Sequence, residues 1–578
     1  MPWLRRLAVP GYALILAVVV TAPLLAPGYL LLRDAVSTPR SHLSDAALGL
    51  TESAPRALPQ DFAVAVASRV LDGGLVVKLL LVAGVWLAGW GAARLAAVLV
   101  PQAGAAGQFV AATVAVWNPY VAERLLQGHW SLLVGYGCLP WVASAVVRLR
   151  AGGARVPGAG LGALCFWLAL AGLTPTGLML AATVALVAVA APGDGWPRPR
   201  CVAAALAVAA LVALPWLVAA GLGQSLSAYQ DSGGAGVADF AARAEPGLGT
   251  LTSLAGLGGI WNAEAVPGSR SGPFAVVATV VLLAVVLAGA PVAARTRTGL
   301  ALLALAATAV VIPAAMATGP GLAAVQAMVS AAPGLGVVRD AQKWVALAVP
   351  GYALAGAGAV VTLRRWRPAL PPAAAAGLCC AAVIAVLPDL AWGAWGRVTA
   401  VHYPPGWARV AAVIDADPRP VAVLPAGSMR RFDWSGPAPV LDPLPRWVRA
   451  DVLATGDLTI SGRTVHGEGG HARSVEGLLL GGADPDRITD AGVGWVLVES
   501  GTGGETGSAA RTLSYFPVVY RDEDLTLYRV GGDAAGAGAE RRRAVVAAHL
   551  AWLAVLVGGA AAMLAGGAAA MLTRRRGA

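Results

Sequence analysis

Long runs of apolar residues recur along this chain and restrict its fold more than any other feature. Of its 578 residues, 57% are hydrophobic and only 13% are charged, whereas a soluble domain carries about a quarter charged residues. A helix needs about 20 apolar residues to cross a bilayer. The sequence therefore predicts an α-helical polytopic membrane protein with about twelve transmembrane helices. They are expected at 9–32, 75–98, 107–122, 130–147, 158–173, 176–191, 201–221, 274–293, 299–318, 342–363, 370–389 and 544–571, of which the third, fifth and sixth are short.

The positive charge of the chain, +11 in total, is concentrated in short arginine clusters between the apolar runs. Cytoplasmic loops of membrane proteins are enriched in Arg and Lys, and the twelve-helix arrangement puts these clusters on one side. We therefore expect a multi-pass protein of the plasma membrane with both termini in the cytoplasm, and we expect no nucleic-acid partner. The clusters are Arg148, Arg150 and Arg155; Arg198 and Arg200; Arg295 and Arg297; Arg364, Arg365 and Arg367; and Arg574, Arg575 and Arg576.

The region 391–542 is dense in Arg, Asp and Glu and has the composition of a soluble domain. Helical and strand patterns alternate in it, which favours a small α/β domain on the outer, extracytoplasmic side. We expect helices at 406–415 and 471–480, strands at 421–425 and 495–499, and a hairpin at 518–530. The predicted division is a transmembrane domain at 1–390, the α/β domain at 391–542, and a last helix with a basic tail at 543–578.

Asp34 is the first acidic residue of the chain and follows the first apolar run directly. One interpretation is an interfacial cap that fixes the depth of the first helix. The other is a carboxylate held at the membrane surface as a general base. Asp45, Glu52 and Asp61 in the same loop are more simply explained as solvated loop charges.

The segment 117–130 is the densest polar and aromatic cluster of the membrane half, and it contains Glu123, Arg124 and His129. Its aromatic residues fit an interfacial belt in which the charged pair marks a turn. A belt accounts less well for several ionisable residues within one short turn. The alternative is that Glu123, Arg124 and His129 bind a substrate.

The segment 333–344 precedes the tenth predicted span and carries Arg339 and Lys343. Four residues apart on an α-helix, these two cations would share one face. Such a pair suits a lipid phosphate or pyrophosphate. The alternative is a pair of snorkelling side chains with Asp340 as their local counter-ion.

His466, Glu468 and His471 are the only residues whose spacing invites a metal site. They lie in a glycine-rich loop and do not match the helical His pattern of zinc proteases. The five cysteines lie in or beside apolar runs and form no metal or disulfide pattern. We therefore expect no metal bound by these residues.

With these segments in view, the chain resembles the large multi-span glycosyltransferases of the GT-C type. It is most similar to YfhO-like membrane proteins and to actinobacterial arabinofuranosyltransferases or mannosyltransferases. The resemblance is carried by Asp34 outside the first helix, the segment 118–130, the segment 333–343 and the α/β domain. It covers most of the chain and concerns architecture more than any single motif.

The resemblance implies inverting transfer of a sugar from a polyprenyl-phosphate donor in the membrane lipid to a cell-envelope glycan or lipid acceptor. It implies Asp34 as the catalytic base, substrate binding by Glu123, Arg124, His129, Arg339 and Lys343, and a divalent cation as the one cofactor to consider. Two other functions stay open on the residues alone. One is a non-catalytic scaffold for envelope assembly, and the other is a transporter or flippase of lipid-linked sugars, which would need charges deep within the spans.

Overall fold

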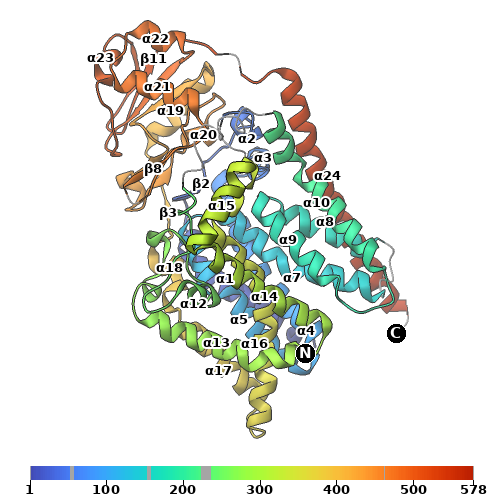
Figure 1. The fold of residues 1–578 in the computed structure, drawn as a ribbon. Helices are drawn as coiled ribbons and strands as arrows, with labels where there is room; N and C mark the ends of the chain where they lie inside the picture. The colour runs from blue at the N-terminus through green and yellow to red at the C-terminus, as the bar shows by residue number, and fades with distance from the viewer. Residues whose placement is uncertain are drawn as a thin grey trace.

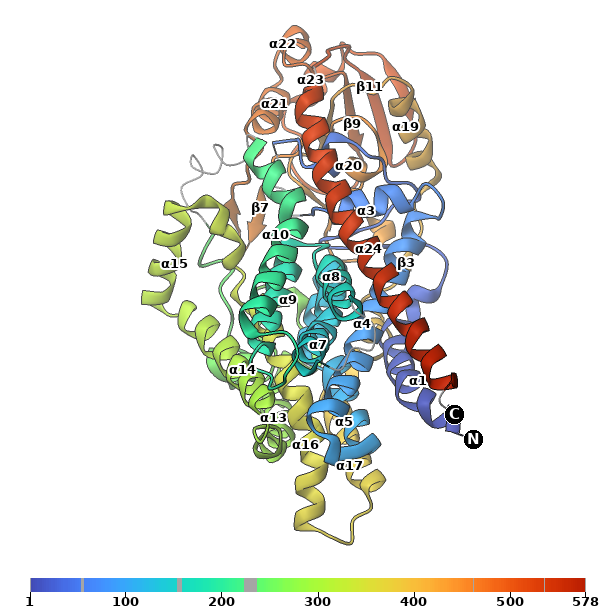
Figure 2. The ribbon, with the colours of Figure 1, turned by 90° about the vertical axis from the view of Figure 1, so that its right-hand side faces the viewer.

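The computed structural model describes residues 2–52, 57–152, 158–222, 236–460, 462–534 and 536–576. A bundle of long helices makes up most of it, and a smaller α/β part stands at one end of the bundle (Figure 1). Helix α1 begins and helix α24 ends at the other end of the bundle (Figure 2).

The prediction of a helical polytopic membrane protein is confirmed. Among the described residues, eight helices are long and apolar enough to cross a membrane. A ninth span is counted if α17 and the helical turns after it, which meet at an angle of 74°, are taken together. The long helices are α1 (Pro2–Thr21), α4 (Gly73–Leu99), α7 (Trp130–Ala151), α10 (Arg198–Leu222), α13 (Phe274–Ala293), α14 (Arg297–Met316), α16 (Val349–Trp366) and α24 (Ala539–Arg576), with α17 (Pro372–Ala385) and α18 (Ala391–Gly396) as the bent pair.

The other three of the twelve predicted spans are present as shorter helices: α5 (Gly104–Val116), α8 (Ala159–Ala171) and α9 (Pro175–Ala188). Thr174 caps α9, with its side chain accepting a hydrogen bond from the backbone of Gly177, and Pro175 occupies the first helical turn. This cap divides one apolar stretch into two helices, as the proline indicates. Further helices lie between or beside the spans: α2 (Asp45–Leu48), α3 (Gln60–Ala67), α6 (Pro119–Leu126), α12 (Thr250–Ala255) and α15 (Gly319–Ala331).

The first helix is shorter than predicted, because α1 ends at Thr21 and the apolar run continues as a strand. Prolines at positions 23 and 27 interrupt the helical hydrogen bonds. Gly28 then adopts a φ of 115°, and a Cβ there would lie 2.6 Å from the carbonyl oxygen of Val401. The chain can therefore leave the bundle and form the hairpin of β1 (Tyr29–Leu32) and β2 (Ala35–Val36).

Every helix and strand that the sequence predicts in the α/β part is present in the structure. Its sheet has the strand order β10-β11-β9-β4, in which β4 and β9 are parallel and the other pairs are antiparallel. The strands are β4 (Val421–Leu424), β9 (Trp495–Glu499), β10 (Val518–Arg521) and β11 (Leu525–Arg529), and the helices are α19 (Pro405–Ala416), α20 (Leu444–Trp447), α21 (Gly470–Leu480), α22 (Pro485–Asp490) and α23 (Ala509–Leu513).

Alternate residues of the central strands pack on the two faces of this sheet. Val423 lies in one apolar cluster with Trp407 of α19, whereas Leu424 lies in a second cluster with Leu479 of α21. The alternation follows from the two-residue period of a strand. Two small hairpins complete the part: β5 (Met429–Arg430) with β6 (Val440–Leu441), and β7 (Leu458–Ile460) with β8 (Arg463–Val465).

The N-terminal hairpin joins the bundle to the α/β part. Strand β1 pairs with β2 on one side and with β3 (Ala400–Val401) on the other. Leu31 and Val36 of this hairpin belong to the same buried cluster as Trp407. A segment that follows the first transmembrane helix therefore supplies part of the core beneath the sheet.

Candidate functional site

Asp34 lies at the tip of the two-residue turn between β1 and β2. Arg33, which precedes it, has a φ of 49°, in the left-handed region that residues other than glycine rarely adopt. The backbone N–H of Arg33 donates to the carbonyl of Pro439 (2.8 Å), and its guanidinium donates to the carbonyl of Leu126 (2.7 Å). The turn is thus held from the α/β part on one side and from the end of α6 on the other.

The carboxylate of Asp34 is fixed in orientation and still exposed. Its Oδ2 accepts hydrogen bonds from His129 Nε2 (2.9 Å) and Gln127 Nε2 (3.1 Å). Its side chain is nevertheless 40% exposed. Burial alone would raise the pKa of Asp34, but the hydrogen bonds from His129 and Gln127 outweigh it and lower the pKa below its ordinary value. Asp34 is therefore an ionised acceptor at neutral pH.

His129, which precedes the first residue of α7, is held between Asp34 and Arg124. A guanidinium only donates hydrogen bonds, so Arg124 Nη1 donates to His129 Nδ1 over 3.1 Å. The proton of a neutral ring is then on Nε2, which faces Asp34. Burial lowers the pKa of His129, and Lys343 and Arg124 lower it further against the opposing effect of Asp34. The ring is thus neutral at neutral pH.

Arg124 is fully buried and forms a two-pronged ion pair with Asp340, with Nη1 to Oδ2 at 2.7 Å and Nη2 to Oδ1 at 3.0 Å. Its Nη2 also contacts Gln342 Oε1. Lys343 Nζ lies 3.5 Å from Asp340 Oδ2. Although burial works against the charged carboxylate, these two cations hold the pKa of Asp340 well below its usual range. The planar fork of arginine suits such a buried carboxylate.

Glu123 is also fully buried, and its carboxylate accepts three hydrogen bonds from the protein. The donors are the backbone N–H of Gly259 (3.1 Å), the backbone N–H of Ile260 (3.2 Å) and Gln342 Nε2 (2.9 Å). Glu123 and Arg124 are thus both buried, and the side chain of Gln342 contacts both of them. Neither side chain has the exposed surface that the predicted direct contact with a substrate requires.

Arg339 and Lys343 do not share a helical face, and that expectation is wrong. The 3₁₀ helix η5 (Pro333–Val338) ends before Arg339, and η6 (Ala341–Ala348) is also a 3₁₀ helix. With three residues per turn, positions four apart point in different directions. The Arg339 guanidinium lies over the ring of Phe240, 5.2 Å from its centroid, whereas Lys343 stays beside Asp340 with its side chain 24% exposed.

Comparison with known proteins finds a similarity in fold and none in sequence. No family profile matches the sequence, and no curated protein is similar to it in sequence. Solved structures of arabinofuranosyltransferase AftD from Mycobacteria are similar to it in fold. One structure matches with a TM-score of 0.56 and 18% sequence identity, and the match covers 92% of this chain. The class 2 structure of the R1389S mutant matches with a TM-score of 0.56 and 17% sequence identity, also over 92% of this chain. The chain therefore has a fold similar to that of these arabinofuranosyltransferase structures.

The chain spans less than half the length of the mycobacterial proteins that it matches, 40% of the first and 42% of the mutant. At this level of identity the comparison concerns the fold. It agrees with the resemblance in overall architecture.

The resemblance to GT-C enzymes raises the question whether a divalent cation binds. The described residues contain no group of three or more His, Cys, Asp or Glu side chains suited to hold one. Asp34 and His129 alone are hydrogen-bonded to each other. Of the three residues whose spacing invited a metal site, His466 contacts Asp457 (3.1 Å), and the backbone of His471 donates to Glu52 (3.0 Å). We derive no chemical step through a metal.

Three features of the candidate site were not predicted from the sequence: the roles of Gln127 and Gln342, and the pairing of Asp340 with Arg124. Asp340 was predicted only as the counter-ion of Lys343, which it also is. Gln127 and Gln342 stand inside the two segments that the sequence singled out. Their uncharged side chains gave no separate signal there.

Proposed function

We propose that this protein transfers a sugar from a polyprenyl-phosphate donor to a cell-envelope glycan or lipid acceptor at the outer membrane face. The observation that carries the proposal is the exposed, oriented carboxylate of Asp34 at the junction of bundle and α/β part. The fold shared with arabinofuranosyltransferase AftD makes an arabinofuranosyl group the first donor sugar to test.

Asp34 acts as the general base in this proposal. An acceptor hydroxyl attacks the anomeric carbon, its proton passes to the Asp34 carboxylate, and the bond from that carbon to the donor phosphate breaks with inversion. A base of this kind contributes typically 10² to 10⁴-fold to the rate. The hydrogen bonds from His129 and Gln127 leave the carboxylate ionised and fix its direction.

The departing lipid phosphate gains negative charge, and the nearby cations provide its stabilisation. Lys343 is partly exposed beside Asp340, and we assign it to the donor phosphate. We assign Arg339, which lies over Phe240, to a separate contact with the lipid-linked donor. We assign His129 to the sugar, since its ring borders Asp34. Glu123 and Arg124 become positioning residues, because their buried side chains hold η6 and His129 in place.

The test is transfer by the purified full-length protein with polyprenyl-phosphate arabinofuranose and an envelope glycan acceptor. Asp34→Asn keeps the size and removes the base, so transfer should fall roughly a hundredfold or more. The matched control is Asp61→Asn, which alters another carboxylate of the segment between α1 and α4, one that lies in α3 and pairs with Arg446 at 3.3 Å. Arg339→Ala should weaken donor use more than acceptor use.

Wild-type rates in purified Asp34→Asn protein would exclude the proposed base. Equal losses in Asp34→Asn and Asp61→Asn would point to a structural effect of the loop. If the wild type transferred none of a panel of polyprenyl-phosphate sugars, the scaffold function would be favoured instead.

A further inference from the structure

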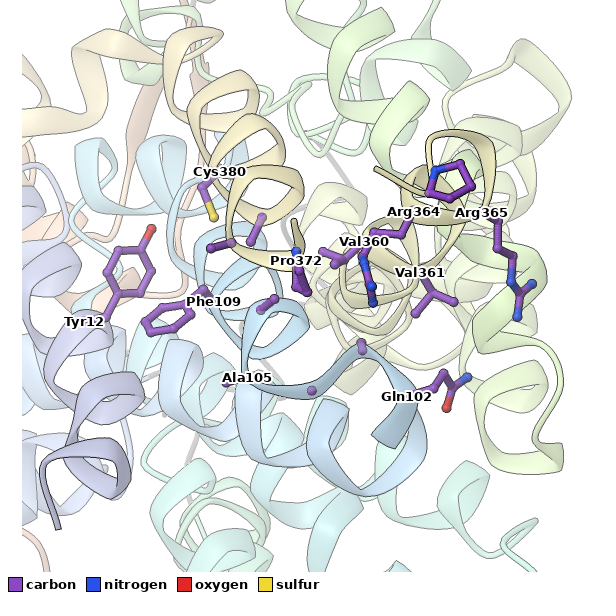
Figure 3. Close-up of a pocket in the computed structure, with 17 residues that line it drawn as sticks. Tyr12, Gln102, Ala105, Phe109, Val360, Val361, Arg364, Arg365, Pro372 and Cys380 are labelled. Atoms are coloured by element: carbon purple, nitrogen blue, oxygen red, sulfur yellow. The ribbon is translucent and has the colours of Figure 1, made fainter. Parts of the chain in front are cut away.

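A cavity of about 930 Å³ opens between the helices at the end of the bundle opposite the α/β part. Residues of α1, α5, α16 and α17 line it, including Tyr12, Phe109, Val360 and Gly377 (Figure 3). Neither Asp34 nor His129 is among its lining residues. The cavity is thus separate from the candidate site, and its role is independent of the proposed function.

The cavity is slightly shallower than the hydrocarbon part of one bilayer leaflet. Along α17 its lining runs from Pro372, the first residue of the helix, to Cys380. Eight residue steps of 1.5 Å give a depth of about 12 Å, and half of the hydrocarbon core is about 15 Å. A single acyl chain that enters from the helix ends would therefore end near Cys380.

At the inner end of the cavity, the polar side-chain atoms are hydrogen-bonded to one another. The Tyr12 hydroxyl and Thr113 Oγ1 are 2.7 Å apart, and Thr113 Oγ1 also lies 3.2 Å from Cys380 Sγ. Phe109 packs edge-on against Tyr12, with ring centroids 5.1 Å apart. These contacts leave an apolar wall, which fits a hydrocarbon chain better than a polar ligand.

The mouth of the cavity, in contrast, is cationic. Arg364 and Arg365 at the end of α16 line it together with Gln102. Figure 3 shows the Arg364 side chain directed toward the cavity and the Arg365 side chain directed outward. The Arg364 guanidinium at the mouth of this apolar cavity can bind a phosphate headgroup, and the exposed Arg365 adds positive charge beside it.

We propose that this cavity binds one anionic phospholipid of the adjoining leaflet, with an acyl chain between α5 and α17 and its phosphate at Arg364 and Arg365. The depth favours a phospholipid over a polyprenyl phosphate, whose much longer chain would extend past Cys380. The bound lipid fills the space between α17 and the rest of the bundle and stabilises that helix.

Native mass spectrometry of the full-length protein in detergent, titrated with phosphatidylglycerol, tests the headgroup part. Arg364→Gln combined with Arg365→Gln should weaken binding roughly tenfold or more, since each basic residue contributes to anionic lipid binding. The matched control combines Arg295→Gln with Arg297→Gln, another exposed pair between two spans, and should bind as the wild type does. Phosphatidylcholine should bind the wild type more weakly than phosphatidylglycerol does, by roughly tenfold or more.

A second variant tests the acyl-chain part. A Cβ at Gly377 meets no atom within 4 Å, so Gly377→Phe can place its ring in the cavity without displacing the backbone. Gly558→Phe is the control, because Gly558 of α24 is equally open and does not line the cavity. Phosphatidylglycerol should raise the melting temperature of wild type and Gly558→Phe by several degrees, and that of Gly377→Phe by much less.

Equal binding of phosphatidylglycerol to the wild type and the Arg364→Gln/Arg365→Gln protein would overturn the proposed phosphate site. Equal thermal stabilisation of Gly377→Phe and Gly558→Phe would overturn the proposed chain site. Displacement of phosphatidylglycerol by an equimolar polyprenyl phosphate would show that the cavity takes the longer lipid instead.

Discussion

Arg430 in the α/β part faces two buried carboxylates and cannot neutralise both. It is ion-paired with Glu499 at the end of β9, and its Nη2 lies 3.9 Å from Asp442 Oδ2. Burial and the neighbouring Asp442 raise the pKa of Glu499 to about 8, and burial raises the pKa of Asp442 as well. A proton is therefore retained in this cluster at neutral pH.

Stability should fall as the pH rises across the range set by Glu499. The pKa of Glu499 is raised in the folded protein. Its contribution to the free energy of unfolding is therefore complete below about pH 4.5 and is lost as the pH rises through about 8. The melting temperature should drop between pH 5 and pH 8, and Glu499→Gln should flatten that slope. Asp486→Asn, at an exposed position of α22, is the control and should leave it unchanged. A slope unaffected by Glu499→Gln would contradict this assignment.

The residues of the candidate site were predictable only where charge gathers in a short segment. Asp34, His129 and Arg124 were all named from the sequence, and the structure brings the three together. Their arrangement was not predictable, because the ion pair of Arg124 with Asp340 joins positions 216 apart in the chain. No local pattern encodes a contact at that separation.

At the scale of elements, the sequence predicted helices and strands well where periodicity is long and clear. Strand β4 and helix α21 lie within a residue or so of the predicted positions. The predicted secondary structure was wrong where an apolar run is broken. Composition alone could not show that 22–32 leaves the helix for a strand paired with β3, or that 341–348 is 3₁₀, since both depend on contacts with distant segments.

Helices α13 and α16 pack so closely that glycine is required at their contact. A Cβ at Gly289 would lie 1.7 Å from the carbonyl oxygen of Ala355, and one at Gly358 would lie 2.4 Å from the carbonyl oxygen of Gly289. Small residues allow such approaches between membrane helices.

Gly289→Val should therefore force the two helices apart and destabilise the bundle by about 1–3 kcal/mol. The measurement is the melting temperature and the yield of monodisperse protein in detergent. Gly558→Val serves as the control, since its Cβ meets no atom within 4 Å, and it should behave like the wild type. An unchanged melting temperature in Gly289→Val would mean that this contact is looser than the structure shows.

At the scale of the whole molecule, two of the arginine clusters lie in the last turns of long helices, α7 and α16. Arg150 in the last turn of α7 donates to the carbonyl of Ala191 (3.0 Å), and the backbone of Gly195 donates to the Arg150 carbonyl (2.8 Å). The connection between α16 and α17, with Arg364 and Arg365, lies at the end away from the α/β part (Figure 1). This arrangement supports the predicted orientation, in which the arginine-rich end faces the cytoplasm.

Topology reporters fused within the full chain test that orientation directly. Fusions after Arg150, Arg200, Arg297 and Arg367 should report the cytoplasm, because inner loops retain the positive charge. A fusion at Gly503, in the exposed loop after β9, should report the exterior. The fusions after Arg150 and Arg200 must give the same result, since Arg150 is hydrogen-bonded to the segment that leads into α10 and cannot lie across the membrane from Arg200. A cytoplasmic signal at Gly503 would place Asp34, whose turn is hydrogen-bonded to the α/β part through Pro439, on the inner side as well, and the donor would then have to be sought among sugars available in the cytoplasm.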